Sequence, residues 1–207
     1  LDQGLRRLYP GSFALVMATG IVSNAFFFLG HGALSATLLV VNLAAYPLLV
    51  GLTVARALRY PRELWADLVN PRLVFSFFTI VAATDILGAQ LHLRGHHQVA
   101  IVLWVVALAL WVALGYFSFA VVTFDGGASG ADVIHGGWLI AIVGTESLVV
   151  LGAPLAPELG GVASYAFVAV YTLWGIGIAF YGIFVTLFAY RLFFLPVDPA
   201  VPVALVA

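Results

Sequence analysis

The sequence predicts an all-α integral membrane protein whose six transmembrane helices form three helical hairpins. Hydrophobic residues make up 64% of the 207-residue chain and charged residues only 8%, whereas soluble proteins carry about 25% charged residues. The mean hydropathy is +1.14. Six apolar stretches each reach the length of about 20 residues that a helix needs to cross the hydrocarbon layer. We therefore expect a single transmembrane domain over residues 1–207.

The predicted helices follow one another closely enough for consecutive helices to pair as antiparallel hairpins. The sixth is the longest, and it ends near Tyr190 and Arg191, where we expect an interfacial turn. In chain order the predicted helices span residues 10–30, 34–58, 72–93, 98–124, 133–154 and 162–195.

Residues 61–69 predict a short interfacial helix between the second and third spans. Pro61 suits the first turn of a helix, and Leu64, Trp65 and Leu68 share one face. A tryptophan on such a face lies at the level of the lipid headgroups. We expect this helix to rest on the membrane surface.

The distribution of arginines predicts the orientation of the chain. It contains no lysine, and only Arg94 among its arginines lies at the end of the helices opposite to the N-terminus. Basic residues concentrate in cytoplasmic segments of membrane proteins, so the N-terminus is expected in the cytoplasm. The arginines on the N-terminal side are Arg6, Arg7, Arg56, Arg59, Arg62, Arg72 and Arg191.

Composition and motifs exclude several classes of function. Eight basic and nine acidic residues give a net charge of −1, which does not favour a nucleic-acid partner. The absence of cysteine excludes disulfides, thiolate metal sites and iron–sulfur clusters. No catalytic motif of soluble enzymes and no phosphate-binding loop is present. We expect neither an enzyme nor a bound cofactor.

A threonine motif recurs on alternate helices. It reads Ala-Thr-Gly around Thr19, Ala-Thr-Asp around Thr84 and Gly-Thr-Glu around Thr145, with spacings of 65 and 61 residues. Such spacing is typical of repeated units, and here it matches the length of a membrane hairpin. All three copies fall on odd-numbered helices, which run in the same direction. This pattern predicts that the odd-numbered helices line a pore and that the even-numbered helices shield them from lipid.

The candidate pathway residues come from these motifs. An acidic side chain at the bilayer centre costs about 2.5–3.5 kcal/mol on insertion scales, so it is by default a functional hypothesis. The alternative is that protonated carboxyls tie helices together, that threonines bond to the preceding turn and that glycines allow close packing. The candidates are Thr19, Gly20, Thr84, Asp85, Gly144, Thr145 and Glu146.

Histidines supply one further candidate. His135 begins the fifth helix on the expected cytoplasmic side, where it could contact an anion. The other histidines lie near the outward ends of the helices and are expected to be solvated, so no metal site is predicted. They are His31, His92, His96 and His97.

Three segments resemble one family of membrane transporters. Pro10–Ile21 (PGSFALVMATGI) resembles the first-helix signature of the tellurite-resistance/dicarboxylate transporter family. Asn70–Phe78 (NPRLVFSFF) is similar to the opening of its third helix, with Asn70 in place of the usual histidine and Arg72 shifted. Gly137–Ser147 (GWLIAIVGTES) resembles the bacterial branch. The family includes bacterial tellurite-resistance proteins, a yeast malate permease and sulfite efflux pump, and the slow anion channel of plant guard cells.

The resemblance implies a larger architecture than six helices. Members of the family have ten helices in five hairpins, with the odd-numbered helices around a pore, often in a homotrimer. The chain would then be a fragment covering the first six of ten helices, in a bacterial inner membrane. The implied function is transport of small anions, such as C4-dicarboxylates, tellurite or sulfite. The alternative is a non-transporting membrane subunit, such as a haem or quinone redox anchor.

Overall fold

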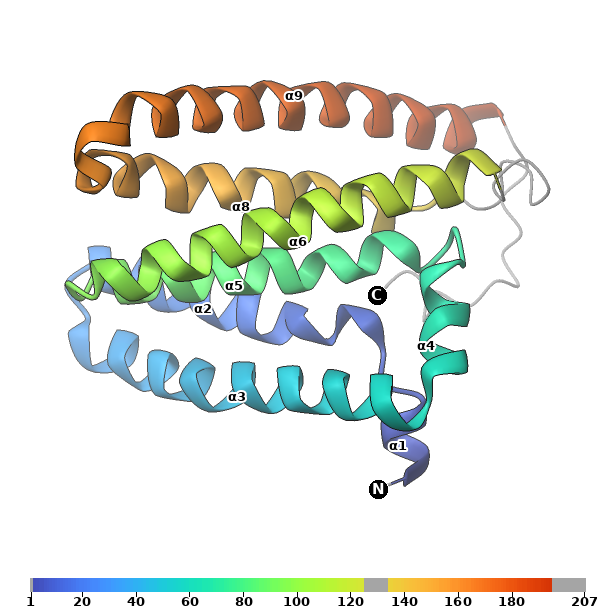
Figure 1. Cartoon of the computed structure of the whole chain (residues 1–207), viewed down its shortest axis with the longest axis horizontal. Helices are drawn as coiled ribbons and strands as arrows, with labels where there is room; N and C mark the ends of the chain where they lie inside the picture. The colour runs from blue at the N-terminus through green and yellow to red at the C-terminus, as the bar shows by residue number, and fades with distance from the viewer. Residues whose placement is uncertain (1, 125–133, 195–207) are drawn as a thin grey trace.

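A computed structural model describes residues 2–124 and 134–194, which form a layer of long antiparallel helices (Figure 1). Every regular element in these two ranges is a helix, which confirms the predicted all-α membrane fold. The six long helices are α2 (Ala14–Phe28), α3 (Gly32–Arg59), α5 (Phe78–His92), α6 (His97–Phe124), α8 (Ile140–Leu155) and α9 (Ala163–Phe194).

The fifth and sixth predicted helices are joined by a short segment that contains a kink. Five helical stretches of the described residues are long and apolar enough to cross a membrane, and the last of them, Gly136–Phe194, contains both α8 and α9 on either side of a kink. The 3-10 segment η5 (Ala156–Val162) connects these two helices, and within it Gly160 has φ 54° and ψ −120°. The chain reverses there, so α8 and α9 lie side by side as a hairpin (Figure 1).

Each hairpin contains the same two local structural features. Its turn contains a glycine with positive φ, at Gly30 (77°), Gly95 (82°) or Gly160 (54°), a conformation that residues with a Cβ rarely adopt. Its first helix is preceded by a short 3-10 segment. These segments are η1 (Pro10–Phe13), η2 (Val74–Phe77) and η4 (Gly136–Leu139).

The three first helices of the hairpins form the inner row of the layer. α5 packs against both α2 and α8, while α3 and α9 lie at opposite ends of the layer and α6 crosses α5 and α8 (Figure 1). Within the apolar window of each span, 83% of α5 is buried, against 6% of α3 and 17% of α6. The even-numbered predicted helices are therefore the outer ones.

Small residues allow the inner helices to approach closely. A Cβ at Gly144 of α8 would lie 3.1 Å from Cδ1 and 3.2 Å from the carbonyl oxygen of Phe78 on α5. Farther along the same interface, a Cβ at Gly88 would meet the Leu151 side chain at 2.5 Å. Glycine at these positions therefore sets the α5–α8 distance.

Two short helices pack at the end of the layer that holds the N-terminus. They are α1 (Asp2–Arg6) and α4 (Pro61–Leu68), and Arg6 bonds Glu63 at 2.8 Å between them. Arg56 of α3 is only 4% exposed, and its Nη2 donates to Asp67 of α4 at 2.7 Å. α4 lies within the segment predicted to be interfacial, and its place at the membrane surface stays a prediction.

Candidate functional site

Two of the three motif threonines join neighbouring hairpins. The Thr84 hydroxyl donates to the carbonyl of Ile80 in its own helix at 2.6 Å and lies 2.8 Å from the Tyr46 hydroxyl of α3. Because Thr84 has already used its one hydrogen, Tyr46 must be the donor of the second bond. Both the hydrogen and a lone pair of Thr84 are thus engaged within the protein.

Thr145 repeats this arrangement one hairpin later. Its hydroxyl donates to the Ala141 carbonyl at 2.8 Å and accepts from the indole Nε1 of Trp111 on α6 at 2.8 Å. In both cases an aromatic donor on the outer helix of one hairpin bonds the threonine on the inner helix of the next. The threonine hydroxyls described here hold hairpins together.

Asp85 lies fully buried at the α5–α8 interface. Its Oδ2 is 2.8 Å from the Ser147 hydroxyl of α8, and its Oδ1 is buried without a hydrogen-bond partner. The Ser147 oxygen also lies 2.9 Å from the carbonyl oxygen of Gly144. A serine has one hydrogen, and a carbonyl oxygen has none to give. Both contacts are satisfied if Asp85 is a neutral acid that donates to Ser147 while Ser147 donates to Gly144.

Glu146 does not join Asp85 in one carboxylate pair. It is only partly buried, and its side chain lies against Gly177 of α9, where an added Cβ would overlap the carboxylate. Among the residues that the structure describes, no hydrogen bond to its carboxylate is found. Asp85 therefore meets α8 through Ser147, and Glu146 faces its own hairpin partner.

The first motif lies at the α2 end of the inner row. Thr19 is half-buried, and no hydrogen bond of its side chain is found within residues 2–124 and 134–194. Gly20 is buried, and a Cβ there would meet the side chains of Ile86, Asn42 and Gln90. Gly20 thus permits close packing of α2 on α3 and α5. Lining of a pore by these motif residues stays a prediction.

His135 is held between two backbone groups. Its Nδ1 accepts from the Gly137 N–H at 2.9 Å, and its Nε2 lies 2.7 Å from the Arg72 carbonyl oxygen, to which it must donate. Burial is the largest influence and lowers the pKa of this imidazole, and the charges of Arg191 and Arg72 lower it further, against the bond to the Arg72 carbonyl. The ring is therefore neutral, and both nitrogens are occupied in this arrangement.

A polar network that the sequence analysis did not select lies between α2, α3 and α5. Asn42 Nδ2 donates to the Val16 carbonyl and to Gln90 Oε1, both at 2.9 Å. Toward the hairpin turns, Arg94 donates to the Ser35 hydroxyl at 2.6 Å. The sequence signals for this network were the two amides within apolar spans, Asn42 of α3 and Gln90 of α5.

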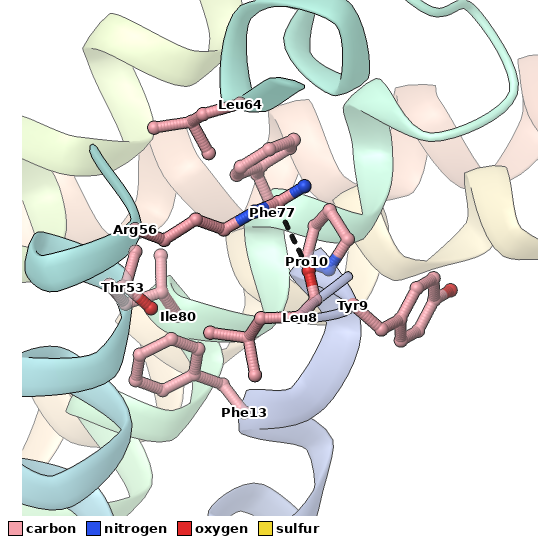
Figure 2. Close-up of a pocket in the computed structure, with 9 residues that line it drawn as sticks. All are labelled: Leu8, Tyr9, Pro10, Phe13, Thr53, Arg56, Leu64, Phe77 and Ile80. Atoms are coloured by element: carbon pink, nitrogen blue, oxygen red, sulfur yellow. Dashed lines mark hydrogen bonds between the residues drawn. The ribbon is translucent and has the colours of Figure 1, made fainter. Parts of the chain in front are cut away.

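The small cavity beside the N-terminal segment does not offer a charge to an anion. It has a volume of about 30 Å³ and is lined by nine residues, among them Arg56 (Figure 2). Arg56 donates to the carbonyls of Arg6 and Leu8 at 3.2 and 2.8 Å and to Asp67 at 2.7 Å. Each of the three guanidinium nitrogens therefore donates a hydrogen bond within the protein, and Asp67 balances the charge, which assigns Arg56 to the packing of this end.

The histidines at the opposite end form one close pair. Nδ1 of His92 lies 2.9 Å from Nδ1 of His97. Within the described part of the chain, no group of three or more metal-binding side chains is found.

Comparison with known proteins places this helical layer in a family. A family profile described as "voltage-dependent anion channel" (SLAC1) matches residues 7–207. The chain is also similar to the uncharacterized transporter MJ0762 of Methanocaldococcus jannaschii, with 26% identity over 190 residues. This match covers 86% of the chain and 54% of the relative, so the chain spans about half the length of that protein. No solved structure matches it significantly. The chain belongs to the voltage-dependent anion channel (SLAC1) family, within the tellurite-resistance/dicarboxylate transporter group that its sequence resembles.

Proposed function

We propose that this chain forms part of a membrane transporter for small anions, with α2, α5 and α8 along the pathway. The observation that carries the proposal is the Asp85–Ser147 contact at the centre of the inner row. Burying an acid in a membrane span is costly, and such groups usually serve transport or proton movement. Membership of an anion-channel family supports anions as the transported class.

The substrates proposed are C4-dicarboxylates such as malate, or the oxyanions tellurite and sulfite. A fixed negative charge in a dry pathway would repel all of them. The neutral acid that the Ser147 geometry favours avoids this repulsion, and release of its proton would couple transport to pH. In this proposal Asp85 and Glu146 are the proton-carrying groups, while Gly20 and Gly144 keep the helices close.

The remaining features of the proposal concern the assembly and its membrane. We place the chain in a bacterial inner membrane. Its N-terminus is oriented toward the cytoplasm, because the basic residues gather at that end. The transporter would work as a homo-oligomer, with a trimer as the first form to test. His135, whose ring joins the Arg72 and Gly137 backbones, would shape the cytoplasmic entrance.

Uptake by proteoliposomes tests the function. The complete gene product containing this chain is reconstituted, and uptake of labelled malate, sulfite and tellurite is compared with that of protein-free vesicles. We expect faster uptake of at least one of these anions. Absence of uptake together with a haem absorption band in the purified protein would instead support the redox-anchor alternative, which family membership does not favour.

A further inference from the structure

The short helix α4 turns both of its acidic side chains toward the rest of the protein. Glu63 accepts a hydrogen bond from Arg6 of α1 at 2.8 Å, and Asp67 accepts one from Arg56 of α3 at 2.7 Å. Leu64, on the same side of the helix, lines the small cavity at this end of the layer (Figure 2). One side of α4 is therefore occupied by contacts within the chain, and its negative charges are neutralised there.

The opposite side of α4 is exposed and carries only hydrogen-bond donors. Helical periodicity brings the four exposed residues of α4 together on this side. They are Pro61, Arg62, Trp65 and Ala66. The Trp65 side chain is 57% exposed, and one edge of its ring meets Phe117 of α6. Guanidinium and indole N–H groups donate hydrogen bonds and accept none, so this side offers positive charge and donors.

Arg59 extends the exposed side of α4 with a second positive charge. It is the last residue of α3, it is exposed, and it precedes Arg62 by three residues. In the part of the chain that the structure describes, no ion pair of Arg59 or Arg62 is found. Residues 2–72 contain six arginines and three acids, and two of these acids are paired inside the chain. We call Arg59, Arg62 and Trp65 the corner surface, because they flank the turn between α3 and α4.

The direction of α4 relates the corner surface to the bilayer. α4 runs across the ends of the long helices, whereas α3 runs along them (Figure 1). A helix across the ends of membrane-spanning helices has the direction expected of one that rests on the membrane surface. Tryptophan prefers the level of the lipid headgroups, and arginine side chains at that level meet lipid phosphates.

We propose that the corner surface binds the headgroup of an anionic phospholipid in the leaflet at this end of the helices. Arg59 and Arg62 donate to the phosphate and balance its charge, while the Trp65 ring lies beside the upper part of the acyl chains. A zwitterionic headgroup carries its own cation beside the phosphate, so two unpaired arginines favour the anionic lipid. The contact lies outside the inner row and holds whichever solute the protein transports.

Fluorescence quenching by brominated lipids tests the proposal. The complete gene product is reconstituted in phosphatidylcholine bilayers that contain an equal share of either phosphatidylglycerol or phosphatidylcholine brominated in the upper acyl chain. The Trp65 signal is the fluorescence of the wild type minus that of Trp65→Phe. We expect brominated phosphatidylglycerol to quench this signal more strongly, and high salt to reduce the difference. Arg62→Gln should lower the relative affinity for phosphatidylglycerol about fivefold, which corresponds to about 1 kcal/mol.

Two further variants separate charge from structure. Arg59→Gln should lower the preference for phosphatidylglycerol by a similar factor, whereas Arg62→Lys keeps the charge and should keep most of the preference. Equal quenching by the two brominated lipids, or no quenching by either, would overturn the proposal. A preference that survives in both glutamine variants, or that is lost equally in Arg62→Lys and Arg62→Gln, would overturn it as well.

Discussion

At the scale of single residues, the number of hydroxyl hydrogens decides how the polar groups are used. The recurrence of the threonine motif on alternate helices predicted Thr84 and Thr145 as pathway residues, with bonding to the preceding turn as the alternative. The structure gives each hydroxyl hydrogen to its own helix and a lone pair to an aromatic donor. The polar positions were predictable from the sequence, but their partners Tyr46 and Trp111 were not, because they are 38 and 34 residues away.

Asp85 is expected to be a neutral carboxylic acid at neutral pH. Only the acid form supplies a hydrogen for each of the two short contacts of Ser147. Infrared difference spectra between wild type and Asp85→Asn should show the carbonyl band of a protonated carboxyl group in the wild type alone. If the Asp85→Asn substitution instead removes a carboxylate band, Asp85 is ionised in the wild type.

His135 should make stability depend on pH. The folded-state pKa of His135 is lowered by burial, whereas an unfolded histidine titrates near 6.5. Its contribution to stability is therefore complete above about pH 6.5 and declines as the pH falls below that value. We expect the thermal stability of the wild type in detergent to fall more between pH 7.5 and 5.5 than that of His135→Gln. Parallel pH profiles of the two proteins would contradict the buried neutral ring.

At the scale of elements, hydropathy located the six helices, and the contacts between them came from the structure. The apolar stretches predicted the first and last residues of α3 and α6 closely, because the thickness of the hydrocarbon layer constrains the length of a membrane-spanning helix. The burial of α5 on all sides was not predictable from its own sequence. It follows from packing against α2, α6 and α8 at once.

Gly144 is a position at which the α5–α8 interface has little room for an added methyl group. An added Cβ would press on Phe78, including its backbone oxygen at 3.2 Å, so the Phe78 side chain and backbone must shift slightly to accommodate it. We expect Gly144→Ala to destabilise the protein by about 1–3 kcal/mol, measured as a lower melting temperature in detergent. At Gly115 an added Cβ meets nothing within 4 Å, so Gly115→Ala should melt at or slightly above the wild type. Equal melting temperatures of the two variants would refute close packing at Gly144.

At the scale of the whole molecule, three similar hairpins stand in a row with α5 at its centre. The threonine repeat predicted this modular build, and the glycine turns and 3-10 segments of the structure repeat with it. Family membership supports anion transport, while the chain spans about half of the relative it matches. The pathway along α2, α5 and α8 therefore has to be tested in the complete gene product.

The most direct test of anion transport is the initial rate of malate uptake into proteoliposomes at several external pH values. Transport through the inner row with Asp85 as a proton carrier predicts uptake above that of protein-free vesicles, with a pH dependence that disappears in Asp85→Asn. Uptake no faster than in protein-free vesicles for malate, sulfite and tellurite alike would contradict anion transport. A pH dependence unchanged in Asp85→Asn would remove Asp85 from the mechanism and leave it as a contact between helices.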